Sequence, residues 1–570
     1  MAIRLLTFII ALVWSVSCFA SGQNRKLVVL FTADLHSQIL PSRQDEGGFA
    51  KIATLVSNER EQALRDSAVF LLLDGGDISM GSVFHTLFGT EAIEYRGMAR
   101  VGYDAFTLGN HAFDFGTDPL LQMFRNAHAK DSMIAFPQLL CANLQCNGIP
   151  SVPYAVLERN GLRIGLFGLM GENSYNVAGK ARDSIGFSDP VEAARKIVGI
   201  LHPQTDYIIA ISHGGTLNGD DISLAQKVKG IDFIVSAHDH DILHFPIYAG
   251  GTPVGAAGSN GKYVGKAVFQ DGELLEYVLL HADSQVAEDP CLANWADSMY
   301  NVVGLEFEKL SGRRLDDTVT ILKQGYPNIM DNEGRMVLGN NIAAAYRDAA
   351  IANMPDVSPD RIVGVVPYGV VRNGLHEGVV TNRDVFEVLS LGENENGCYG
   401  YPLVYVWITG EELEDLCEMS VSVGPLLEDT RLFFAGLEYS YNGARLPFMR
   451  VGSVCVSGRE ASPHGLYMVV TGSYTAQLIG LLAGESYGIL SAVAKNADGE
   501  PLAGGYLPLH TASGGIITEW EAFAGYLQQK GFDPAADKGA AVKEGTVPFE
   551  YIMAGILLCA AMFCFMRKRK

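Results

Sequence analysis

Short apolar runs that end in polar, potentially metal-ligating side chains recur through the first half of the chain. Four such runs are LVVLFT, VFLLL, YIIAIS and IDFIVS, and Asp or His follows each within a few residues. Runs of four to eight aliphatic or β-branched residues are typical of buried strands. We expect these strands to deliver their polar side chains to one edge of a sheet, where a single pocket could collect them.

Five short blocks of sequence carry eight potential metal ligands. These are Asp34 and His36, Asp77, Asn110 and His111, His213, and His238 and His240. Such side chains suit Mn, Zn, Fe or Mg, and an Asp between two ions can bridge them, as two-metal hydrolysis requires. A single Asp-x-His or His-x-His at a strand end is more often a hydrogen-bonding group of a loop, so the prediction rests on all five blocks together.

Strand-like runs alternate with amphipathic helical stretches from Lys26 to about Ala282, which indicates an α/β layered domain. The helical stretch from Pro290 to Leu310 resembles a linker, and a second α/β pattern follows it. The predicted organisation is a signal peptide over 1–20, a first α/β domain over 26–285, a linker helix over 286–312, a second α/β domain over 313–527, a stalk over 528–546, a transmembrane helix over 547–566 and a basic cytoplasmic tail over 567–570.

The apolar segments near the two ends of the chain predict that the protein is exported and anchored in a membrane. Arg4 precedes the apolar run LLTFIIALVWSV, and small residues follow, as in a signal peptide cleaved after Ala20. Near the other end, sixteen uncharged residues from Tyr551 to Met566 precede four cations. We expect a spanning helix with the catalytic domains on the extracytoplasmic side, at the cell surface or another membrane. A buried C-terminal helix, or exchange of this segment for another anchor, is the alternative.

Charge and cysteine content narrow the class of protein further. A formal net charge of -22 excludes a general nucleic-acid-binding surface and suits an acidic ectodomain. Six cysteines remain outside the two terminal segments, namely Cys141, Cys146, Cys291, Cys398, Cys417 and Cys455. In an exported chain they permit up to three disulfides, and the near neighbours Cys141 and Cys146 could pair.

The five ligand blocks, in this order, resemble the calcineurin-like metallophosphoesterases, although Ala237 stands where that family usually has Gly. The resemblance implies a four-layer β-sandwich flanked by helices, with two divalent ions (Mn, Zn, Co or Mg). It assigns Asp34, His36, Asp77 and His240 to one ion and Asp77, Asn110, His213 and His238 to the other. Asp77 would then be the shared ligand.

His111 directly follows Asn110 and can point away from the ions toward a scissile phosphate. Asp114, three residues later, is within reach to hold its ring. A His oriented in this way could stabilise charge on the phosphoryl group or the leaving oxygen. The family resemblance implies the same catalytic pair, and a structural His that caps the turn is the alternative.

The second half resembles the C-terminal substrate-binding domain of the 5'-nucleotidase and UDP-sugar hydrolase family, through LGNNIAAAYRDA, VPYGVVRNGLHEGVVTNRDVFEVLS and LVYVWITGEEL. Arg372 matches an Arg that clamps substrate phosphate or ribose in that family. Leu391 replaces one of the family's two stacking rings, and Tyr474 aligns near the other. Tyr399 and Tyr401 lie close to the lost ring and could substitute for it.

The sequence therefore predicts an exported, membrane-anchored phosphohydrolase that cleaves nucleotides to nucleosides and phosphate with a metal-activated water. A related phosphoesterase for UDP-sugars, cyclic nucleotides or non-nucleotide phosphate esters is the nearest alternative. A surface binding protein that kept the scaffold without turnover is the alternative from another class. The intact ligand set argues against that last reading.

Overall fold

The computed structural model describes residues 26–542, apart from 179–181, 183, 218, 393–398, 426, 478–491, 503 and 537–539. The predicted signal peptide, transmembrane helix and basic tail lie outside these residues. Within the described part of the chain, no helix is both long and apolar enough to cross a membrane. Two compact units are present, one formed up to Met80 and by Phe84–Val303, the other by Gly81–Val83 and from Gly304 onward.

The first unit is built on two six-stranded sheets. One has the order β14-β13-β1-β2-β3-β4, with β1 (Lys26–Thr32), β2 (Val69–Asp74), β3 (Ala105–Phe106), β4 (Gln138–Leu139), β13 (Tyr263–Gln270) and β14 (Glu273–His281). The other has the order β11-β12-β10-β9-β7-β6, with β6 (Tyr154–Arg159), β7 (Leu162–Met170), β9 (Tyr207–His213), β10 (Phe233–Ser236), β11 (Ile247–Ala249) and β12 (Thr252–Gly255). In each sheet the ligand-bearing strands are parallel neighbours, β1 with β2 and β9 with β10.

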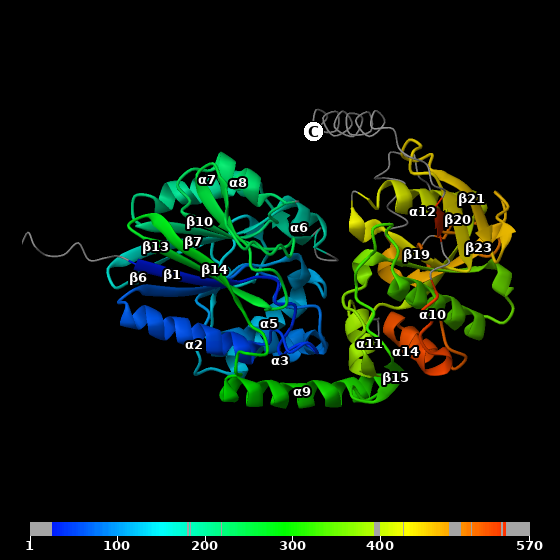
Figure 1. The fold of residues 1–570 in the computed structure, drawn as a ribbon, viewed down its shortest axis with the longest axis horizontal. Coiled ribbons are helices and arrows are strands. Elements are labelled where there is room, and N and C mark those ends of the chain that lie inside the picture. The colour runs from blue at the N-terminus through cyan, green and yellow to red at the C-terminus, as the bar shows by residue number, and fades with distance from the viewer. Residues whose placement is uncertain are drawn as a thin grey trace, which may run out of the picture. The chain divides into compact units, whose positions relative to one another are not determined.

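Four layers result from the way these sheets bury their apolar faces. Alternate residues of β1 and β2, such as Val29 and Leu71, meet Ile209 and Phe233 of the other sheet in one fully buried core. The outer faces are covered by α2 (Phe49–Arg65), α4 (Ile93–Val101) and α5 (Thr117–Lys130) on one side and by α7 (Pro190–Leu201) and α8 (Asp221–Lys227) on the other (Figure 1). Helix α7 begins where the sequence favours it, since Asp189 accepts a hydrogen bond from the Glu192 amide and Pro190 fills the first helical position.

The second unit has a mixed five-stranded sheet of order β19-β16-β23-β18-β24, made of β16 (Ile362–Pro367), β18 (Leu403–Thr409), β19 (Leu432–Ala435), β23 (Leu466–Gly472) and β24 (Leu507–Pro508). Smaller sheets pair β15 (Thr318–Leu322) with β17 (Gly378–Thr381), and join β20 (Leu437–Tyr441), β21 (Val451–Val456), β22 (Arg459–Glu460) and β25 (Ala540–Val542). Its helices are α10 (Val337–Asn353), α11 (Asn382–Val388), α12 (Gly410–Ser422) and α14 (Glu519–Lys530). Capping boxes start α11, α12 and α14, each a Thr with an acidic residue three positions later.

The predicted two-domain α/β architecture is confirmed, and helix α9 (Pro290–Ser311) lies where the linker helix is expected. Strand β16 ends at Pro367, because Tyr368–Val370 turn into a 3-10 helix. Two details differ from the predictions. The segment expected to form a stalk from 528 begins with the last residues of α14. Farther along, it forms β25, which pairs with the backbone of β20. Among the described cysteines no disulfide is present, so Cys141 and Cys146 are free thiols.

Candidate metal centre

The predicted ligands gather at one edge of the two sheets of the first unit. Asp34 and Asp77 follow the ends of β1 and β2, and Asn110 begins a 3-10 helix (Asn110–Phe113) just after β3. In the other sheet His213 is the last residue of β9, while His238 comes two residues after β10. Parallel neighbours end at the same edge, so the β-strand pattern itself brings these side chains together.

An unusual backbone conformation aims most of these side chains. Asp34, His36, Asp77, His238 and His240 all have positive φ angles, between 48° and 95°. Such a conformation costs a non-glycine residue about 1–3 kcal/mol and persists where the surroundings fix it. The loops here are fixed to each other, since the Asp34 amide donates to the Gly76 carbonyl and the His36 amide to the Asp77 carbonyl, both at 3.0 Å.

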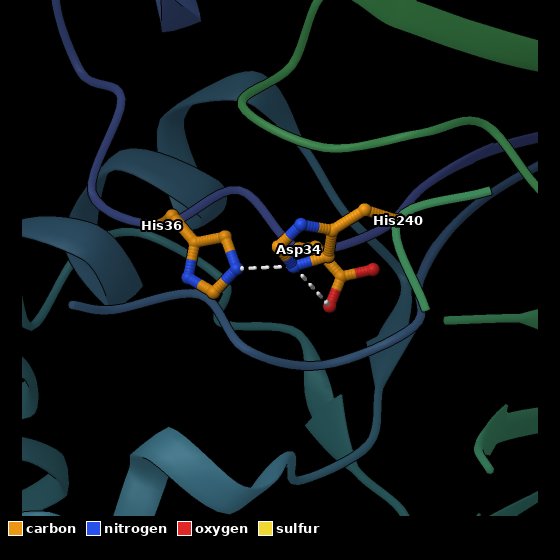
Figure 2. A group of neighbouring side chains, drawn as sticks. All are labelled: Asp34, His36 and His240. Atoms are coloured by element: carbon orange, nitrogen blue, oxygen red, sulfur yellow. Dashed lines mark hydrogen bonds and ion pairs between the residues drawn. The ribbon is translucent and has the colours of Figure 1, made fainter. Parts of the chain in front are cut away.

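One group of donors consists of Asp34, His36 and His240, whose ligand atoms lie within 4.8 Å of one another. Figure 2 shows the two rings meeting beside the carboxylate, with 2.9 Å between their Nε2 atoms. His36 Nδ1 lies 3.2 Å from the Ser79 carbonyl, an arrangement in which Nδ1 donates its proton. That bond leaves the Nε2 lone pair of His36 facing His240, and two such nitrogens at contact distance favour a shared cation.

A second group consists of Asp77, His213 and His238. His213 Nδ1 donates to the Gly75 carbonyl at 2.9 Å, so its Nε2 faces Asp77 Oδ2 at 3.0 Å. The amide oxygen of Asn110 lies 3.3 Å from the same Nε2. The two groups are neighbours, because His213 Nε2 is also 4.0 Å from Asp34 Oδ1.

Glycines make room for this packing. A Cβ on Gly109 would lie 2.0 Å from Asp77 Oδ1, so no larger residue fits between Asn110 and the preceding strand. A Cβ on Gly75 would lie 2.6 Å from the Cβ of Ala237. The departure from the family pattern at Ala237 is therefore accommodated, because Gly75 opposite it has no side chain.

The pKa values of the buried groups indicate that the centre holds positive charge. Burial disfavours the charged forms of Asp77 and His213, but their contact prevails: the pKa of Asp77 lies well below its usual value, and that of His213 rises to about 9. Burial raises the pKa of Asp34 to about 7 and, together with the charge of His213, lowers the pKa of His238 to about 3. A proton on His213 thus balances two carboxylates, a role for which a divalent ion is well suited.

His111 and Asp114 form the predicted pair. His111 Nδ1 lies 2.6 Å from Asp114 Oδ2, and the His111 amide donates to Asp77 Oδ1 at 2.9 Å. The ring of His111 stands edge-on to that of His36, with 5.4 Å between ring centroids. The contact with Asp114 therefore fixes the orientation of the His111 ring.

The predicted substrate residues of the second unit have mixed outcomes. Tyr399 belongs to the core instead of a binding surface: it is buried, and its ring stacks on Phe307 with centroids 6.1 Å apart. Tyr401 and Tyr474 are half-buried and stack on each other, 5.5 Å between centroids and 13° from parallel. Arg372 is half-buried just after the 3-10 turn, and its guanidinium makes no hydrogen bond or ion pair within the described residues.

Sequence reasoning missed the polar residues that hold the ligands. Asp74 accepts from Thr32 Oγ1 at 2.7 Å and from the Gly76 amide at 2.9 Å, which ties the ends of β1 and β2 together. Ser174 donates to Asn110 Oδ1 at 3.3 Å from a helix (Glu172–Asn176) that follows β7. A polar residue at the end of an apolar strand was visible for Asp74, whereas nothing in the sequence marks Ser174.

This sandwich fold and its paired donor groups define a calcineurin-like phosphoesterase unit, and the family model of that description matches residues 27–241. A second model, the 5'-nucleotidase C-terminal domain, matches residues 300–480. The chain thus combines a calcineurin-like phosphoesterase domain with a 5'-nucleotidase C-terminal domain, and it is a metal-dependent phosphoric ester hydrolase.

Individual relatives agree with this assignment. A 5'-nucleotidase of Vibrio cholerae is 25% identical over 514 residues, covering 80% of this chain and 85% of the relative. A 5'-nucleotidase of Diplobatis ommata is 28% identical over 507 residues, covering 79% and 82%. The crystal structure of a 5'-nucleotidase precursor from Thermus thermophilus has the same fold, with a TM-score of 0.68, 22% identity and coverage of 91% of this chain and 100% of that one.

Proposed function

We propose that this chain hydrolyses 5'-nucleotides to nucleosides and phosphate with two divalent ions at the sheet edge of the first unit. The observation that carries the proposal is the pair of donor groups, Asp34–His36–His240 and Asp77–His213–His238, beside the His111–Asp114 pair. Asn110 completes the second group through its amide oxygen. This donor set of carboxylates, imidazoles and one amide fits a divalent transition metal or magnesium.

The bound ions would polarise phosphoryl oxygens and lower the pKa of water. The residues of the chain supply the rest. His36 and His213 are held by backbone carbonyls through Nδ1, so their Nε2 atoms are available as ligands without rotation. His111, held by Asp114, presents Nε2 as a hydrogen-bond donor to the oxygen that gains charge as the phosphorus–oxygen bond breaks. Arg372 would clamp the nucleotide's phosphate or ribose.

The test is a turnover screen on purified, metal-stripped protein. Nucleoside monophosphates, UDP-sugars, cyclic nucleotides and sugar phosphates are supplied in turn, with Mn, Zn, Co and Mg added separately. We expect fastest release of phosphate from nucleoside monophosphates, and turnover only after a metal is added. Turnover of another phosphate ester but of no nucleotide would refute the substrate assignment while leaving the phosphohydrolase assignment in place.

One observation favours the related phosphoesterase as second candidate. One of the two positions where the family stacks a base is altered: Leu391 replaces the ring there and is buried, and Tyr399, a candidate substitute for that ring, is buried as well. A substrate without a base, or with one bound less tightly, would tolerate that change. The same screen separates the two candidates. Complete absence of turnover with two ions bound would support the binding-protein alternative.

We also propose export and membrane anchoring, from the apolar segment 547–566 and the basic tail. The full chain and a version that ends at residue 546 are expressed side by side and fractionated. The full chain should stay with membranes after a carbonate wash and be released by detergent, whereas the shortened chain should be released without detergent. A full chain that leaves the membrane in carbonate would refute the anchor.

A further inference from the structure

A buried carboxylate, that of Asp221, joins the ends of the two strands that carry the histidines of the second donor group. Its side chain is almost fully buried, at 1% exposed. Its Oδ1 accepts from Ser212 Oγ and its Oδ2 from Ser236 Oγ, both at 2.6 Å. Asp221 is the first residue of α8, so one side chain links this helix to two strands.

The two serines are paired in the sheet. Ser212 of β9 and Ser236 of β10 are register partners in parallel strands, so their side chains lie on the same face. His213 is the residue after Ser212, and His238 comes two residues after Ser236. The amide of Ala237, between Ser236 and His238, donates to the Ser212 carbonyl at 3.0 Å. A shift of either serine would therefore move a ligand.

The connecting loop closes around the same carboxylate. The Asp221 amide donates to the Gly215 carbonyl at 3.0 Å, and the Gly215 amide donates to the Ala237 carbonyl at 2.8 Å. Gly214 leaves the space that Asp221 needs, since a Cβ there would lie 2.6 Å from its Oδ1. Thr216 Oγ1 lies 2.9 Å from Ser236 Oγ and extends the hydroxyl chain. The carboxylate is thus the shared acceptor of a small closed network.

We propose that Asp221 is a positioning residue that sets His213 and His238 for the second ion. The inference rests on the proposed function, because it assumes that these histidines bind metal. Asp221 touches neither ring and acts through Ser212 and Ser236. Loss of a group that orients metal ligands usually weakens metal affinity about 10- to 100-fold. Asp34 and His36 of the first donor group follow β1, which lies outside this network, so the first ion should be spared.

Asp221→Ala and Asp221→Asn separate positioning from bulk stability. Alanine removes both acceptors. Asparagine can accept from Ser212 and donate to Ser236, whose hydroxyl then donates to Thr216, so the network survives with one reversal. Asp104→Ala is the matched control in the same unit. Asp104 also joins two segments, by accepting from the Leu72 amide and from Arg159, but it precedes β3, whereas the ligand Asn110 follows that strand.

The experiment titrates metal-stripped full chain in detergent with Mn²⁺, and measures bound Mn per chain by elemental analysis and the coupling between ions by electron paramagnetic resonance. Wild type and Asp104→Ala should bind two coupled ions. Asp221→Ala should bind one ion with near wild-type affinity, and its affinity for the other ion should fall about tenfold or more. Its resonance signal should be that of uncoupled ions. Asp221→Asn should restore the coupled pair.

Each result decides between outcomes. Two coupled ions with unchanged affinity in Asp221→Ala would overturn the inference, as would an Asp221→Asn variant no better than Asp221→Ala. Failure of the wild type itself to bind two ions would overturn the proposed function. This result comes from the wild-type titration alone and does not depend on the variants. If Asp221→Ala does not fold, Ser236→Ala removes one arm of the network alone and should weaken the second ion, and an unchanged affinity there would refute the inference.

Discussion

The candidate metal centre of the first unit and the tyrosine pair of the second are held in place in different ways. Most side chains of the metal centre are buried, five of them stand on backbone with positive φ, and hydrogen bonds join the loops that carry them. The pair Tyr401–Tyr474 consists of half-buried rings, one just before β18 and one just after β23, that stack on each other. Rigid placement suits a site that must bind charge with fixed geometry, whereas ring contacts tolerate adjustment. Substitutions should therefore have abrupt effects in the first region and graded effects in the second.

The largest effect is expected at Asp77, which contacts His213 and accepts from the His111 amide. Asp77→Ala should lose both ions and all measurable turnover, because a shared carboxylate cannot be removed from one site alone. Elemental analysis of the purified variant measures this, with Asp118→Ala on the exposed face of α5 as control. Full occupancy by two ions in Asp77→Ala would show that Asp77 is not a shared ligand.

His111→Ala should come next, with both ions retained and turnover reduced about 100-fold or more. The reason is that His111 acts on charge that develops during the reaction, and its ring is oriented by Asp114 at 2.6 Å. Steady-state kinetics and metal content are measured together, and exposed His128→Ala serves as control. Loss of an ion from His111→Ala would make it a ligand, and unchanged rates would remove it from the reaction.

The same comparison shows which features of the two regions the sequence could predict and which it could not. The strand ends and the order of ligand types are local patterns, so the paired α/β units and the gathering of Asp34 and Asp77 at one edge followed from them. The positive φ angles and the carboxylates of Asp74 and Asp221 depend on neighbours distant in the chain, which a local pattern does not contain. The burial of Tyr399 depends in the same way on a distant neighbour, because Phe307 belongs to a helix almost one hundred positions earlier.

Metal binding should depend on pH because protons occupy the centre when metal does not. The pKa of His213 is raised to about 9 by Asp77, and that of Asp34 is raised to about 7 by burial. Both groups bind protons more tightly in the folded than in the unfolded chain, so the stability they contribute is present at low pH and is lost as pH rises through these values. Ions must displace the same protons, so their stabilising effect should grow in that direction. Melting temperatures with and without Mn²⁺ should differ more at pH 8.5 than at pH 6, and an equal or smaller difference would contradict these proton positions.

The smallest effects are expected in the second unit. Tyr401 and Tyr474 already contact each other, so a base can stack on one outer face but cannot fit between the rings as they stand. One-sided stacking is worth about 0.5–1.5 kcal/mol beyond the buried area. Because about 1.4 kcal/mol corresponds to one decade, adenosine, guanosine and uridine monophosphates should have kcat/KM values within about tenfold of one another. Tyr474→Leu should lower all three less than tenfold, and Arg372→Ala should lower them together by more, since its guanidinium would contact the phosphate or ribose common to all. A thousandfold preference for one base would instead require the rings to separate and admit that base between them. The second region would then bind its ligand with a geometry as fixed as that of the metal centre.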